Sequence, residues 1–76
     1  MRKQDFYDEI KEIMEIEDEI VDSTKLKDYE EFDSLAVMSL IALINSKFGR
    51  RIPGTVLQNV QTPAELVTLI GVENFD

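Results

Sequence analysis

One short stretch of the chain combines residue types that could support chemistry. Asp33, Ser34 and Leu35 follow a run of acids and open an apolar segment that extends to Ile44. A serine at the start of a helix most often caps it. A phosphate ester on that serine would also be favoured, because unpaired N–H groups and the helix dipole attract anions. The stretch is therefore a candidate attachment site, with capping alone as the simpler alternative.

The rest of the composition argues against catalysis. The 76 residues contain no cysteine and no histidine, which removes thiolate metal sites, cysteine nucleophiles and serine–histidine pairs. We therefore do not expect a stand-alone hydrolase. The acids of residues 17–22 lack the alternating spacing and the turn glycine of a calcium loop, so we expect no metal site.

The charge distribution indicates which partners fit. Residues 1–33 hold 13 acids and 5 bases, whereas residues 34–76 hold three of each, so the first part carries the whole net charge of −8. Such a field repels nucleic acids and anionic lipids and favours basic docking surfaces. The N-terminus lacks a signal-peptide apolar region, and no apolar run reaches the ~18 residues of a membrane span. We expect a cytoplasmic monomer that binds no nucleic acid and does not insert into a membrane.

The elements that must position Ser34 are all helical. Residues 3–16 show the apolar spacing of an amphipathic helix, and residues 17–33 lose it, which predicts a long loop with apolar anchors. A second helix is expected from Asp33-Ser34 to a stop at Gly49. Its core face is predicted to hold Val37, Leu40, Ile41, Ile44 and Phe48, and its remaining apolar residues, Leu35, Met38, Ala42 and Leu43, are predicted to project elsewhere.

The last third of the chain predicts two further helices. Residues 55–59 are long enough for one short turn. Thr62 and Glu65 form a capping box with Pro63 at the first helical position, and Gly71 ends the final helix. The tail of residues 72–76 is expected to fray. The chain is thus predicted to be one domain, residues 1–76, with an all-α fold: a small four-helix bundle of three main helices and one short helix.

In this setting Asp33-Ser34-Leu35 resembles the attachment motif of the acyl carrier protein family. Members of that family are small acidic helical bundles that carry a 4′-phosphopantetheine arm on the serine of an Asp-Ser-Leu triplet. The triplet alone is a weak motif. The resemblance covers almost the whole chain, however, including the first helix, the anchored loop, Ile52-Pro53 and the Thr62-Pro63 start of the last helix.

The resemblance implies a concrete role. A phosphopantetheinyl transferase would attach 4′-phosphopantetheine from coenzyme A to Ser34, with Asp33 helping to orient the reaction and Leu35 beside it. The thiol of the arm would carry acyl groups as thioesters between loading and processing enzymes. The protein itself would not be an enzyme and would have no catalytic residues. Leu35, Met38 and Ala42 would form the apolar part of the docking site.

Two departures from the family pattern argue against housekeeping fatty acid synthesis. The outer positions of the second helix, where fatty-acid carriers usually place acids, hold Ala36, Ser39, Asn45 and Ser46. Phe32 precedes Asp33, which is similar to carriers of nonribosomal peptide and related pathways. We expect an acyl carrier of a fatty acid, polyketide or other specialised pathway. The alternatives are an aminoacyl or peptidyl carrier, for instance of D-alanine, and an unmodified helical interaction module.

Overall fold

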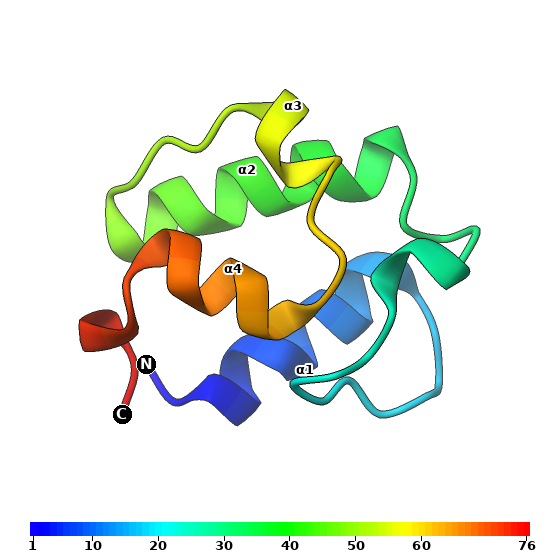
Figure 1. Ribbon diagram of the computed structural model, residues 1–76, viewed down its shortest axis with the longest axis horizontal. Coiled ribbons are helices and arrows are strands. Elements are labelled where there is room, and N and C mark those ends of the chain that lie inside the picture. Colours follow the sequence, from blue (N-terminus) through cyan, green and yellow to red (C-terminus); the bar gives the residue numbers. More distant parts are fainter.

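The computed structural model describes residues 1–76 as a bundle of four α-helices with two 3₁₀ turns and no strands. The helices are α1 (Lys3–Met14), α2 (Ser34–Phe48), α3 (Gly54–Leu57) and α4 (Pro63–Ile70), and the turns are η1 (Leu26–Asp28) and η2 (Val72–Asn74). In Figure 1, α1 and α2 run in opposite directions, α4 lies beside them, and the short α3 crosses near α2. The predicted all-α four-helix fold is confirmed. None of these helices combines the length and the apolar character needed to cross a bilayer.

Local sequence signals explain most of the helix ends. Asp33 caps α2 through its side chain, and Gly49 ends it with a left-handed backbone (φ 65°) and a hydrogen bond from its N–H to Asn45 O. Pro63 occupies the first position of α4, where its missing N–H costs nothing. The predicted capping box does not form, because neither of its two hydrogen bonds is present. The Thr62 side chain makes no cap hydrogen bond, whereas the Glu65 carboxylate accepts one from Gln61 N–H at 2.7 Å.

The core gathers apolar side chains from every helix and from the long loop. Its fully buried large members are Phe6, Ile10, Ile20, Leu26, Leu40, Ile44, Leu57, Leu66 and Ile70. No polar or charged residue is buried among them. Val37 belongs to this core as predicted, while Ile41 and Phe48 are only partly buried at its edge. One face of α2 is therefore buried in the core, and the opposite face is exposed to solvent.

The tail does not fray, contrary to the prediction from its position alone. Phe75 packs against Phe6 and Phe48 with ring centroids 5.4 and 5.1 Å apart. Backbone hydrogen bonds also join the two ends of the chain, from Met1 N to Asn74 O and from Asp76 N to Met1 O. The termini consequently lie side by side (Figure 1).

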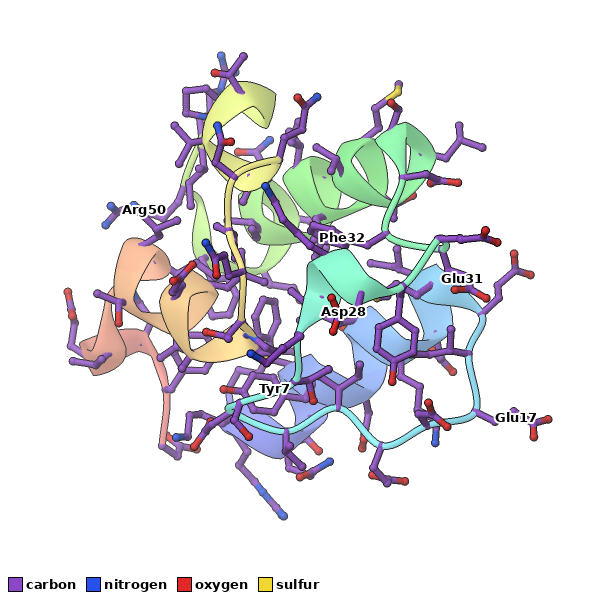
Figure 2. The ribbon with its side chains drawn as sticks, turned by 45° about the vertical axis from the view of Figure 1, so that its right-hand side comes forward. Tyr7, Glu17, Asp28, Glu31, Phe32 and Arg50 are labelled. Atoms are coloured by element: carbon purple, nitrogen blue, oxygen red, sulfur yellow. The ribbon has the colours of Figure 1, made fainter.

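Acidic side chains of the long loop hold it in place through hydrogen bonds. Asp22 accepts hydrogen bonds from Tyr7 and Lys3 of α1, and Asp18 accepts one from Tyr29 at 2.7 Å. Two backbone hydrogen bonds also connect the loop to the region of α4. Leu26 N–H donates to Gln61 O, just before α4, and Ala64 N–H, in the first turn of α4, donates to Asp22 O. In Figure 2, Tyr7 lies below Asp28 of η1, close to the long loop. Glu19 pairs with Lys11, so three of the four acids at residues 17–22 are bonded to protein groups.

The hydrogen bond from Tyr7 to Asp22 should make the free energy of unfolding depend on pH. The Tyr7 hydrogen bond, followed by Lys3, lowers the pKa of Asp22 below its ordinary 3.8, whereas burial and the same hydrogen bond raise the pKa of Tyr7. The contribution of Asp22 to the free energy of unfolding is therefore fully present above pH 3.8, and it is lost as the pH falls through the lower pKa of Asp22 in the folded state. The Tyr7 contribution is full below its ordinary 10.0 and is lost as the pH rises toward its folded pKa.

We expect Tyr7→Phe to lose less stability than the wild type when the pH falls from 5 to 2, roughly the interval in which such carboxylates protonate. Urea unfolding at each pH measures this. Asp28→Asn is the control, because the Asp28 side chain is exposed and makes no hydrogen bond. If the free energy of unfolding fell equally with pH in the wild type and in Tyr7→Phe, the role of this hydrogen bond would be contradicted.

Candidate functional site

Ser34 is the first residue of α2 but not its cap. The Asp33 carboxylate accepts the hydrogen bond from Ala36 N–H at 3.0 Å and so performs the capping. The Ser34 hydroxyl makes no hydrogen bond, and the residue is exposed. The structure thereby separates the two roles that the sequence left open: Asp33 completes the helix end, and the Ser34 hydroxyl is available for another use.

The surroundings of Ser34 suit a phosphate ester. The N–H groups of Ser34 and Leu35 lie in the first turn of a 15-residue helix and donate to no protein acceptor. Such groups, together with the helix dipole, favour an anion. No acid lies in the first turn of α2 itself, although Asp33 precedes it. A phosphodiester-linked arm on Ser34 requires an exposed hydroxyl and is favoured by unpaired N–H donors near the phosphate. Ser34 has both features.

A groove begins at Ser34 and runs between η1, the start of α2 and the end of α3. Its volume is about 320 Å³, and its lining combines two apolar residues, Phe32 and Val37, with four polar residues, Lys27, Asp33, Ser34 and Gln58. In Figure 2, Phe32 lies between η1 and α2. The groove could receive an extended polar chain with an apolar wall on one side.

The outer face of α2 is apolar and free of acids. Leu35 is 72% exposed and Met38 is 65% exposed, and Ala42 is exposed one turn further along. These three residues recur three and four positions apart, which places them on one helix face, as predicted. Ala36 is different, because it is buried with 2% exposure and therefore is not one of the outer positions. Ser39, Asn45 and Ser46 are exposed and uncharged.

Sequence reasoning missed the polar lining of the groove. Lys27 precedes Ser34 by seven residues and Gln58 follows it by 24, so only the fold brings them together. Neither residue belongs to a periodic pattern or a motif, and the sequence alone offered no signal for either. Asp33, Ser34 and Leu35 were found because they are consecutive and begin a helix.

Asp33 should have two separable functions, as a cap and as a charge. We expect Asp33→Ala to lower the free energy of unfolding by ~1 kcal/mol, because Ala36 N–H loses its acceptor. Asp33→Asn should restore most of that stability, since an asparagine oxygen also caps helices. Thermal or urea unfolding measures the effect. Equal stability of Asp33→Ala and the wild type would contradict the capping assignment.

Comparison with known protein families gives a direct result. A family model described as "phosphopantetheine attachment site" matches residues 4–70, from the first turn of α1 to the last residue of α4. Neither a curated protein nor a solved structure matched the chain.

Proposed function

The chain belongs to the phosphopantetheine attachment site family, and on that basis we propose that Ser34 bears the arm and that residues 1–76 act as one acyl carrier domain. Carriers of this family hold 4′-phosphopantetheine covalently on a serine and are not themselves catalysts. The observation that carries the assignment of Ser34 is its free, exposed hydroxyl beside a helix end that Asp33 already caps.

Attachment needs little from this chain beyond access and orientation. The Ser34 oxygen would form a phosphodiester with the phosphate of the arm, losing its hydroxyl proton, while the nucleotide part of coenzyme A leaves. A separate phosphopantetheinyl transferase would perform that step. When bound, the arm supplies a thiol that carries acyl groups as thioesters, which this cysteine-free chain cannot do alone.

The groove beside Ser34 supports a role in holding the arm. The free N–H groups of Ser34 and Leu35 would stabilise the phosphate, and the Lys27 ammonium would add an attractive charge. Gln58 offers both a donor and an acceptor for amide groups. Phe32 and Val37 would line the apolar side.

We assign docking of the transferase and of acyl-processing enzymes to Leu35, Met38 and Ala42. This apolar face lies within one to two helical turns of Ser34, so an enzyme that acts on the arm must cover it. The absence of acids from the face favours a specialised biosynthetic pathway over fatty acid synthesis, because fatty-acid partners use charge recognition. Phe32 before Asp33 supports the same choice.

Loading in vitro tests the proposal. The protein is incubated with coenzyme A, magnesium and a broad-specificity phosphopantetheinyl transferase, and its intact mass is recorded. We expect the mass of one phosphopantetheine to be added. A protein that stays unmodified under conditions in which a known carrier is fully loaded would overturn the carrier function. Subsequent loading with an amino acid but not with acyl groups would replace the acyl cargo by an aminoacyl cargo.

A further inference from the structure

We propose that an apolar acyl chain carried on Ser34 lies in the surface groove between α3 and α4. This inference rests on the proposed function, because the phosphopantetheine arm of Ser34 holds the chain. It deepens that function by giving the cargo a chemical class, an aliphatic acyl group, and a binding site outside the core.

The groove between α3 and α4 is the largest hollow of the molecule, with a volume of about 460 Å³. Its lining combines four apolar residues, Val56, Val60, Ala64 and Leu69, with three polar residues, Asn59, Glu65 and Thr68. Binding sites for small molecules have volumes of roughly 300–1,000 Å³ and are lined mainly by apolar groups. The groove therefore has the size and the composition of such a site.

The polar side chains of this lining are already bonded to the backbone of the protein. Asn59 Nδ2 and Thr68 Oγ1 each donate to the carbonyl oxygen four residues earlier, at 2.8 and 3.2 Å. The Glu65 carboxylate accepts a hydrogen bond from Gln61 N–H at 2.7 Å. Mainly apolar surface is thus left for a ligand, and an aliphatic chain gains more from it than a charged aminoacyl group does.

Two apolar side chains of the groove are in contact with water. Val56 is 39% exposed and Leu69 is 37% exposed, whereas Val60 beside them is buried. Each methylene group of an acyl chain that covers these side chains removes apolar area from water. The hydrophobic effect therefore favours the occupied groove over the empty one.

The groove lies within reach of an arm on Ser34. Ser34 and Gln58 line the same smaller groove, and the next residue, Asn59, lines the groove between α3 and α4. The two grooves consequently adjoin at the end of α3, which ends at Leu57. An extended phosphopantetheine arm is about as long as four extended peptide residues, roughly 15 Å. An arm that follows the first groove therefore brings its thioester to the second.

The interior of the bundle offers no comparable space. The fully buried side chains of the core, such as Leu40, Ile44 and Ile70, line none of the five pockets in the structure. An acyl chain would enter the core only by displacing side chains that are packed there, and such displacement costs free energy. The surface groove accepts the chain without this cost.

The position of the acyl chain is tested on the loaded protein. Carrier with isotope-labelled methyl groups is loaded by the transferase with octanoyl-coenzyme A in one sample and with acetyl-coenzyme A in another. The acetyl form is the control, because it has the same thioester but a chain too short to fill the groove. Nuclear Overhauser effects between the acyl group and the methyl groups are recorded for both forms.

We expect the octanoyl chain to show nuclear Overhauser effects to Val56, Val60 and Leu69, and the acetyl group to show none. Contacts to core residues such as Ile44, or no contacts at all, would overturn the inference. Contacts that grow with carrier concentration would also overturn it, because they would place the chain on a second copy. A wild-type protein that is not loaded on Ser34 would instead overturn the proposed function itself.

Urea unfolding of Leu69→Glu gives an independent test. In the wild type, the octanoyl form should unfold at a higher urea concentration than the acetyl form, because a ligand that binds only the folded state stabilises it. This difference should disappear in Leu69→Glu, which places a charge in the wall of the groove, and should persist in the control Val72→Glu, which changes an exposed valine of η2.

Each variant is compared with its own acetyl form, so a loss of stability caused by the substitution itself does not affect the result. An octanoyl effect of equal size in Leu69→Glu and Val72→Glu, or no octanoyl effect in the wild type, would contradict the assignment of the groove.

Discussion

Ser34→Ala is expected to abolish loading completely and to leave the fold intact. The substitution removes the Ser34 hydroxyl, which is exposed and makes no hydrogen bond. Its free energy of unfolding should stay within about 0.5 kcal/mol of the wild type, because the cap is made by Asp33 and no buried contact is lost. Intact mass after incubation with the transferase and unfolding in urea measure the two effects.

Ser39→Ala is the matched control for this prediction. Ser39 is an exposed serine on the same helix, but it lies inside α2 rather than at the first turn. We expect this variant to gain one phosphopantetheine as the wild type does. Loading of Ser34→Ala would show that another hydroxyl accepts the arm, and the site would then be assigned wrongly.

Met38→Glu is expected to impair every step in which an enzyme docks on α2. Met38 is 65% exposed at the centre of the apolar face, so the substitution places a charge where a partner would bury an apolar side chain. A loss of ~2 kcal/mol in binding is typical for a central interface residue, which corresponds to a roughly 30-fold lower kcat/KM for loading. The kinetics of loading at limiting carrier concentration measure it.

Val72→Glu provides the control, because Val72 is also 65% exposed and lies in η2, away from α2. It introduces the same charge and should leave kcat/KM within about twofold of the wild type. If Met38→Glu and Val72→Glu load equally well, the outer face of α2 is not the docking surface.

The sequence predicted the parts of the fold that depend on local signals. The helix start at Asp33-Ser34, the stop at Gly49 and the position of Pro63 each follow from the backbone preferences of a few adjacent residues. The amphipathic pattern of residues 3–16 likewise predicted α1, which ends slightly earlier, at Met14. The attachment site was predictable because it coincides with such a local signal.

The remaining features arise from tertiary packing. Ala36 is buried, and Phe75 holds the tail, because of neighbours that are distant in the sequence. The groove beside Ser34 combines residues from η1, α2 and the end of α3.

The attachment of phosphopantetheine to Ser34 is tested most directly by locating the group in the chain. Wild-type protein loaded with coenzyme A and a transferase is cleaved by a protease, and the peptides are fragmented in a mass spectrometer. We predict that the added mass lies on the peptide that contains Ser34 and that the fragments place it on this residue alone. Added mass on Ser39, Ser46 or any other residue, or no modified peptide from a protein preparation that loads a known carrier, would contradict the assignment.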